Sequence, residues 1–135
     1  YRAKAKSCQR LAALLCDRFG GEVPRTLEEL VTLQGVGRKT ANVVLGNAFD
    51  TPGITVDTHV GRLSRRWGWT REEDPVKAEM DLAKILPQPD WTIICHRIIY
   101  HGRQVCHSRK PDCLACPMAD LCPSYELIVG VPYEG

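Results

Sequence analysis

The chain has 135 residues, 44% of them hydrophobic, which suits one globular domain or two small lobes. Its formal net charge at pH 7 is only +2, so bulk charge gives no indication of a polyanionic partner. The sequence shows no transmembrane run and no secretory signal, and the compartment expected for it is the reducing cytoplasm.

Apolar residues recur at helical spacing in the first part of the chain, with no strand-like alternation between the helical runs. Gly20 and Gly21 end the first predicted helix, and Thr26 with Glu29 forms a capping box for a short second one. The helices predicted in this part are residues 4–19, a short segment ending near 32, and residues 38–48.

Helix signals continue in the rest of the chain. Asp74 and Pro75 supply an N-cap and a first-turn proline, and Asp90 is expected to cap the helix after them. The predicted helices are residues 58–67, 75–86 and 91–102, and the tryptophans within or beside them are expected to pack in cores rather than to stack on bases. The sequence therefore predicts an all-α fold.

Residues 33–41 read L-Q-G-V-G-R-K-T-A and lie between two predicted helices. Gly35 and Gly37 allow a tight hairpin in which Val36 points inward and backbone N–H groups point outward. N–H groups at the start of a helix favour an anion, so this segment, with Arg38, is predicted to bind nucleic-acid phosphates. A plain helix–helix turn is the alternative, but the apolar Leu33 and the helix-opening run after the hairpin favour the phosphate site.

Lys39 lies in the first turn of predicted helix 38–48, where the positive end of the helix disfavours an ammonium group. Its pKa is therefore expected to be lowered, which makes a neutral, nucleophilic amine available. Residues 56–59 read V-D-T-H, and Asp57 is placed to cap the next helix and to stabilise positive charge or move protons near Lys39. Taken alone, these residues are better interpreted as a surface lysine and an ordinary cap.

Four cysteines near the end of the chain stand in the pattern C-x6-C-x2-C-x5-C, which can close around one metal centre. Disulfides are disfavoured because the chain has seven cysteines, an odd number, and three of them lie alone in helical patterns. Only one C-x2-C arm occurs, which favours an iron–sulfur cluster over zinc. The four in the pattern are Cys106, Cys113, Cys116 and Cys122, and the three others, expected to be small buried residues, are Cys8, Cys16 and Cys95.

Basic residues gather in short groups despite the small net charge. Arg62, Arg65 and Arg66 are spaced i, i+3, i+4 and could extend a nucleic-acid surface, with a solvated stripe as an equal alternative. Residues 107–112 bulge between the first two cysteines of the pattern and carry Arg109 and Lys110, a short cationic finger suited to phosphates.

Together the L-Q-G-V-G-R-K-T-A hairpin, the V-D-T-H segment and the cysteine pattern resemble, in order and separation, the signature of the endonuclease III group of helix-hairpin-helix DNA glycosylases. The resemblance runs over residues 1 to about 125. It implies that residues 1–51 are the second half of a helical-barrel domain with the helix-hairpin-helix, and that residues 52–135 are an iron–sulfur cluster domain. It also implies that the cluster loop, residues 106–122, holds a [4Fe-4S] cluster.

The resemblance implies a base-excision repair enzyme that acts on double-stranded DNA as a monomer, removes oxidised pyrimidines and cleaves abasic sites. Lys39 would attack C1′ of a flipped nucleotide, expel the base and form a Schiff base that β-eliminates the 3′ phosphate. Asp57 would activate the lysine and stabilise the sugar cation. Gly35 and Gly37 would present N–H groups to phosphates, and His59 would lie beside the pocket, although a structural role for this histidine is equally open.

The chain opens at Tyr1 without an initiator methionine and lacks the family's N-terminal part, so it is expected to be a fragment of a larger enzyme. A pocket open on one side is then expected. The alternative is a non-catalytic DNA-binding module that keeps the hairpin and the cluster, and a zinc-stapled interaction domain is a third option. Retention of both Lys39 and Asp57 favours the enzyme, whereas the missing N-terminal part favours the module.

Overall fold

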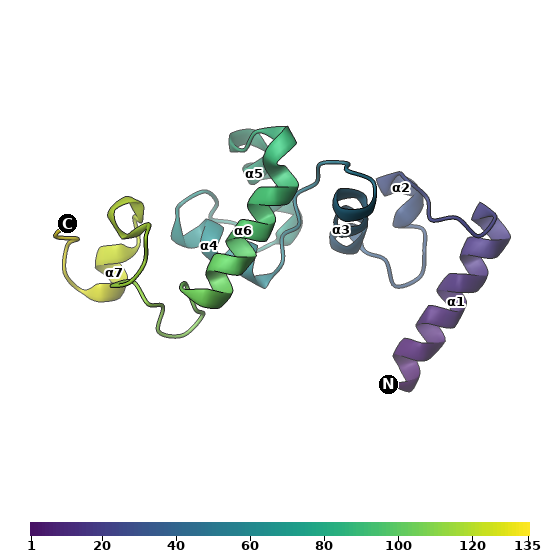
Figure 1. Cartoon of the computed structure of the whole chain (residues 1–135), viewed down its shortest axis with the longest axis horizontal. Helices are drawn as coiled ribbons and strands as arrows, with labels where there is room; N and C mark the ends of the chain where they lie inside the picture. Colours follow the sequence, from purple (N-terminus) through teal and green to yellow (C-terminus); the bar gives the residue numbers. More distant parts are fainter. The chain divides into compact units, whose positions relative to one another are not determined.

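The computed structural model describes residues 1–135, and all of its regular elements are helical (Figure 1). The predicted all-α fold is therefore confirmed. The chain divides into two compact units, Tyr1–Gly53 and Ile54–Gly135, and each unit has a hydrophobic core of its own. No helix in the structure is both long and apolar enough to cross a membrane.

The first unit contains three helices: α1 (Arg2–Phe19), α2 (Leu27–Leu30) and α3 (Arg38–Ala48). Helix α1 begins before the predicted position because the carbonyl of Tyr1 already accepts a hydrogen bond of 3.1 Å from the Ala5 amide. It ends at Gly20, whose φ of 62° is the left-handed conformation that glycine adopts without strain. The predicted cap of α2 is present, since the Thr26 hydroxyl accepts a 3.3 Å hydrogen bond from the Glu29 amide.

Helix α1 contributes one face of its second half to the core of the first unit. Leu11, Leu14, Leu15 and Phe19 pack against the four buried residues of this core, which are Leu30, Leu33, Ala41 and Leu45. The prediction that Cys8 and Cys16 are buried is wrong, because both are exposed. Cys8 precedes the packed half of the helix, and Cys16 follows Leu15 by a 100° rotation that takes it off the packed face.

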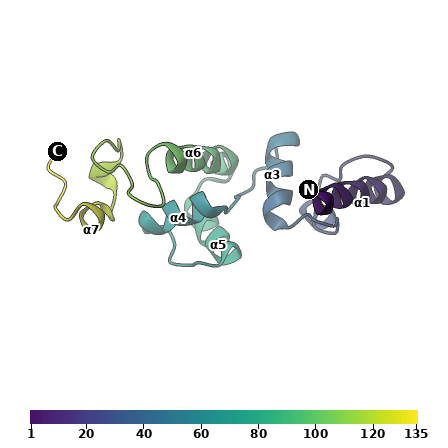
Figure 2. The ribbon, with the colours of Figure 1, turned by 90° about the horizontal axis from the view of Figure 1, so that it is seen from below.

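The second unit contains four α-helices and two short 3₁₀ turns. They are α4 (Thr58–Arg66), α5 (Pro75–Ile85), η1 (Gln88–Asp90), α6 (Trp91–Gln104), η2 (Ala119–Leu121) and α7 (Tyr125–Val129). Helix α4 packs along α6, as Figure 2 shows from below. Gly68, with φ of 74°, follows the end of α4, as the sequence predicted.

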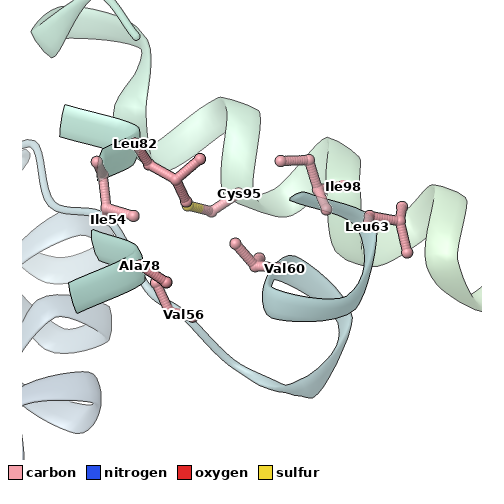
Figure 3. Packing of buried hydrophobic residues seen from close by; sticks show 8 residues of the cluster. All are labelled: Ile54, Val56, Val60, Leu63, Ala78, Leu82, Cys95 and Ile98. Carbon is pink, nitrogen blue, oxygen red and sulfur yellow. The ribbon is translucent and has the colours of Figure 1, made fainter. Parts of the chain in front are cut away.

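The core of the second unit is built by the segment before α4 and by helices α4, α5 and α6 (Figure 3). The three tryptophans are half-buried and pack against it, as predicted. The eight buried residues of the core are Ile54, Val56, Val60, Leu63, Ala78, Leu82, Cys95 and Ile98. This core ties the start of α4 to the helix that leads into the cysteine-rich segment.

The prediction that Asp90 caps α6 through its side chain is wrong. Turn η1 runs directly into α6, so Asp90 has a helical backbone with φ of −96° and ψ of −4°, and its side chain makes no cap hydrogen bond. A side-chain cap requires an extended backbone at the N-cap residue. Asp74 has that geometry, with ψ of 121°, and accepts hydrogen bonds from the Val76 and Lys77 amides.

Candidate nucleic-acid interface and metal centre

The hairpin before α3 is a tight turn closed by a 3.1 Å hydrogen bond from the Val36 amide to the Leu33 carbonyl. Gly35 has a φ of 84°, a value that favours glycine at this position. Val36 is half-buried and packs against the core of the first unit, so the predicted inward position of this side chain is confirmed. Packing of Val36 thus holds the turn on the body of the unit.

Helix α3 begins at an N-cap that offers no side-chain acceptor. Gly37 is that N-cap, with an extended backbone, and Arg38 and Lys39 follow as exposed residues of the first turn. The first amides of a helix have no acceptor within the helix, and the helix dipole makes this end positive. In contrast, side-chain oxygens cap the starts of α2, α4 and α5, and they belong to Thr26, Asp57 and Asp74.

Asp57 caps α4, as the sequence predicted. Its Oδ1 accepts a 2.8 Å hydrogen bond from the Val60 amide, and its backbone is extended, with φ of −89°. The residue is half-buried, at the point where the chain passes from buried Val56 into the helix. The carboxylate therefore has a fixed direction at the start of α4.

His59 lies between α4 and α6 beside a closely packed glycine. Its Nδ1 is 3.2 Å from Nη2 of Arg62, and a Cβ placed on Gly102 would come within 3.0 Å of the same nitrogen. Nη2 of Arg62 also donates to the carbonyls of Gly102, at 3.0 Å, and Cys106, at 2.8 Å. Burial, and then the charge of Arg66, lower the pKa of Arg62 from its ordinary value.

Arg66, one helical turn after Arg62, contacts the beginning of the cysteine-rich segment. Its Nη1 is 3.1 Å from the sulfur of Cys106 and donates to the His107 carbonyl at 2.8 Å. Its Nη2 donates to the Ser108 carbonyl at 3.0 Å. Because these acceptors lie about 40 residues further along the chain, helix α4 directly supports the loop that carries the first cysteine.

Neither sequence interpretation of the arginine triplet describes Arg62 and Arg66. Both side chains turn toward backbone carbonyls of their own unit instead of lining a solvated stripe or an open cationic surface. Arg65 alone of the three is exposed, with Nη1 at 3.3 Å from the Glu72 carbonyl. The i, i+4 spacing of Arg62 and Arg66 signals a shared face, but nothing local in the sequence identifies the acceptors.

All four cysteines of the pattern line one cavity, together with Arg66, Trp67, His101 and several apolar residues. All four are free and half-buried. No three His, Cys, Asp or Glu side chains are grouped closely enough to hold a single metal ion, so the fit rests on the four thiols around the cavity. Four sulfur ligands around one cavity suit an iron–sulfur cluster, which is typically held by four cysteine thiolates. The four are Cys106, Cys113, Cys116 and Cys122.

Burial around the cavity shifts the pKa values of two thiols and a histidine toward their neutral forms. Burial, followed by the neighbouring Cys106, raises the pKa of Cys113, and burial raises the pKa of Cys116. His101 lies with Nε2 at 3.6 Å from the sulfur of Cys116, and burial lowers the pKa of this histidine. Nothing in the local sequence singles out His101, because its partner Cys116 lies 15 residues further along the chain.

The predicted finger is an exposed bulge. The amide of Asp112 donates to the Val105 carbonyl at 3.0 Å and closes its base, and Arg109 and Lys110 are exposed. Lys110 has a φ of 52°, a left-handed conformation uncommon for a residue other than glycine. Two adjacent cations thus lie on a backbone whose shape needs support from its neighbours.

Two family models match the segments described above. Residues 18–46 match the helix-hairpin-helix motif, which includes α2, the hairpin and most of α3. Residues 106–122 match the iron–sulfur binding domain of endonuclease III, which includes all four cavity thiols. The iron–sulfur cofactor predicted from the cysteine pattern is confirmed by this match.

The most similar relatives include two bacterial proteins named endonuclease III. The protein of Synechocystis sp. is 55% identical over 125 residues, which cover 92% of this chain and 57% of the relative. That of Bacillus subtilis is 49% identical over 123 residues, which cover 90% of this chain and 56% of the relative. The chain thus spans rather more than half the length of these relatives.

Solved structures give the same result. A non-covalent endonuclease III–DNA complex superposes with a TM-score of 0.90 at 45% identity, over 97% of this chain and 62% of that chain. A trapped endonuclease III–DNA covalent intermediate superposes with a TM-score of 0.88 at 47% identity, over 94% of this chain and 60% of that one. By sequence, by fold and by its paired helix-hairpin-helix and iron–sulfur segments, the chain belongs to the endonuclease III family.

Proposed function

We propose that the chain is part of a bifunctional DNA N-glycosylase and AP lyase of base-excision repair, which acts as a cytoplasmic monomer on oxidised pyrimidines and abasic sites in duplex DNA. The observation that carries this proposal is the start of α3, where no side chain caps the helix and Lys39 is exposed in its first turn. An anion site and a primary amine therefore lie within one helical turn of each other. The similar structure of a trapped covalent endonuclease III–DNA intermediate supports covalent chemistry on DNA.

In this proposal two surface features bind the DNA backbone. At the hairpin, the amides of Gly35 and Gly37 and the side chain of Arg38 contact phosphates. At the finger, Arg109 and Lys110 contact phosphates as exposed cations. In this proposal His59, at the start of α4, lies beside the damaged nucleotide, with its ring next to Arg62. These contacts read the backbone and leave the choice of base to other residues.

Lys39 performs the chemistry as the nucleophile in this proposal. Its Nζ forms a bond to C1′ of the flipped nucleotide, while the bond from C1′ to the base nitrogen breaks and the base leaves with the electron pair and takes up a proton. The sugar ring opens to give a Schiff base between C1′ and Nζ. Loss of a proton from C2′ then drives the 3′ phosphate out, which cleaves the strand by β-elimination.

Asp57 and the four cysteines have supporting roles. The Asp57 carboxylate, held at the start of α4, accepts the lysine proton and stabilises positive charge on the sugar. Cys106, Cys113, Cys116 and Cys122 would hold a [4Fe-4S] cluster, which would supply a structural cross-link within the second unit. With these four ligands bound, the backbone on which the finger lies would be fixed.

Borohydride trapping on a duplex with a single abasic site tests the proposal. The iron-loaded chain is compared with Lys39→Ala and with Lys77→Ala, a variant of another exposed lysine in the first turn of a helix, α5. A covalent adduct is expected with the parent and with Lys77→Ala, and none with Lys39→Ala. Trapping by Lys39→Ala at the parental yield would contradict the assignment of the nucleophile.

A second protein sample distinguishes two explanations for the absence of an adduct, an incomplete pocket and a non-catalytic binding module. A chimera extends the chain to the full length of its Synechocystis relative and is trapped on the same duplex. If the chain alone gives no adduct, an adduct from the chimera that is lost on Lys39→Ala supports the enzyme. Duplex binding without any adduct from the iron-loaded chimera would instead support a non-catalytic module.

A further inference from the structure

Arg66 contacts the start of the cluster loop, residues 106–122, and the chain just after its end. Its guanidinium contacts the sulfur of Cys106 at 3.1 Å and the carbonyls of His107 at 2.8 Å and Ser108 at 3.0 Å. Its own carbonyl accepts a 2.5 Å hydrogen bond from the hydroxyl of Ser124, just after the last cysteine. One residue of α4 therefore contacts the loop where it begins and the chain just beyond where it ends.

These contacts need the planar fork of an arginine. Three acceptors on consecutive residues are reached by two nitrogens of one guanidinium, which presents its donors in a fixed plane. A lysine has the same charge but a single nitrogen, which cannot reproduce this arrangement. Arg66 is half-buried, and its contact with the Cys106 sulfur is partly shielded from competing water.

The residues held by Arg66 lead directly into the finger. The carbonyls of His107 and Ser108 precede Arg109 and Lys110, and Lys110 has the left-handed φ of 52°. A residue other than glycine keeps that conformation only where its surroundings impose it. The hydrogen bonds from Arg66 are the nearest support on the N-terminal side of this strained position.

We propose that Arg66 is a positioning residue that sets the finger on its DNA-binding surface and stabilises Cys106 as a cluster ligand. The proposal rests on the proposed function, because it takes Arg109 and Lys110 as contacts to DNA. Arg66 acts through the loop, since its donors are directed to the protein's own carbonyls and sulfur. Arg62 supports the same segment from the preceding turn, through the Cys106 carbonyl.

Cluster retention tests the hold on Cys106. Arg66→Gln and Arg66→Lys are compared with Arg65→Gln, the matched change at the exposed neighbour on the same helix. The visible absorbance of the cluster is followed after addition of an iron chelator, and bound iron and sulfide are measured. Arg66→Gln is expected to lose the cluster about tenfold faster than the parent, as is common when a partner of a metal ligand is removed. Arg65→Gln is expected to lose it at the parental rate, and an equal rate in Arg66→Gln would overturn this half of the proposal.

A double-mutant cycle tests the action through the finger. The Kd for an undamaged duplex is measured for the iron-loaded parent, for Arg66→Lys, for Arg109→Ala/Lys110→Ala, and for the combination of all three changes. Arg66→Lys keeps the charge. With the finger intact, it is expected to raise the Kd several-fold over that of the parent. In the Arg109→Ala/Lys110→Ala background, adding Arg66→Lys is expected to change the Kd by no more than about twofold. Equal losses in the two backgrounds would mean that Arg66 does not act through the finger.

DNA binding by the finger variant alone shows whether a failure lies in this proposal or in the proposed function. Removing two phosphate contacts is expected to weaken binding and to lower the slope of log K against log salt by about 2. If Arg109→Ala/Lys110→Ala binds as tightly as the parent, the finger is not a DNA contact and that part of the proposed function fails. The chelator experiment then still decides whether Arg66 holds the cluster loop, because it uses no DNA.

Discussion

Oδ1 of Asp57 accepts a 2.8 Å hydrogen bond from the amide of Val60, so the proposed catalytic carboxylate is also the N-cap of α4. The two roles can be separated by substitution. Asp57→Asn keeps a good cap and should change the free energy of unfolding by only a few tenths of a kcal/mol, whereas Asp57→Ala should cost about 1 kcal/mol. Both variants should lose abasic-site cleavage. Urea unfolding and a nicking assay check this prediction, and cleavage by Asp57→Asn at the parental rate would remove Asp57 from the mechanism.

Substitution by serine should destabilise the protein at one hairpin glycine and be tolerated at the other. Gly35 has a φ of 84°, so Gly35→Ser should destabilise the first unit by about 1 kcal/mol. Gly37 has a φ of −89° with no atom within 4 Å of an added Cβ, and serine is a good N-cap, so Gly37→Ser should be tolerated. Thermal unfolding of the two variants checks the contrast, and equal losses would show that backbone conformation is not the cause.

Loss of one cluster ligand should lower the stability of the second unit. Cys113→Ser removes a thiol from the cavity, and because cluster binding is coupled to folding, the variant should carry less iron and unfold at a lower temperature. Cys8→Ser, at an exposed cysteine of α1, is the matched control and should match the parent in both measurements. Parental iron content and Tm in Cys113→Ser would exclude this thiol from the cluster site.

Acid should destabilise the second unit in part through His101. Burial lowers the pKa of His101 below its ordinary value of 6.5, so between these two values the unfolded chain binds more protons than the folded one. The stability supplied by the neutral imidazole is therefore complete above pH 6.5 and is lost as the pH falls through the folded pKa. The urea midpoint should fall less between pH 7.5 and 5.5 in His101→Gln than in the parent.

His96→Gln provides the control for this measurement, since His96 is exposed on the same helix, α6. Its urea midpoint should follow the parental pH dependence. If His101→Gln also follows the parent, burial of His101 has no effect on stability in this pH range.

Local chemistry explains which elements the sequence could predict. The bounds of α3 were predicted correctly, and those of α4 and α5 to within about a residue, because glycine, aspartate and proline at their ends act through neighbouring amides and fixed dihedral angles. The cap at Asp90 was wrong because the preceding 3₁₀ turn leaves no extended residue before α6. That turn has no strong signal of its own in the sequence.

Contacts between distant residues explain what the sequence missed at the candidate site. The cysteine pattern and the hairpin could be read because each lies within a short segment. Arg62 and Arg66 could not be assigned, because their acceptors lie 40 to 44 residues away and become neighbours only when α4 packs on α6. Separation along the chain therefore decided which residues of the site could be predicted.

Cys95 lies in the core of the second unit, so its thiol can report when that core opens to solvent (Figure 3). Its side chain is 4% exposed, and burial raises the pKa of its thiol, so a thiol reagent has neither access to it nor a thiolate to attack. Cys8 and Cys16 are exposed and mark the intrinsic rate of labelling in the same molecule. In iron-loaded protein, the labelling rate of Cys95 relative to that of Cys8 and Cys16 therefore measures how often the packing of α4, α5 and α6 opens.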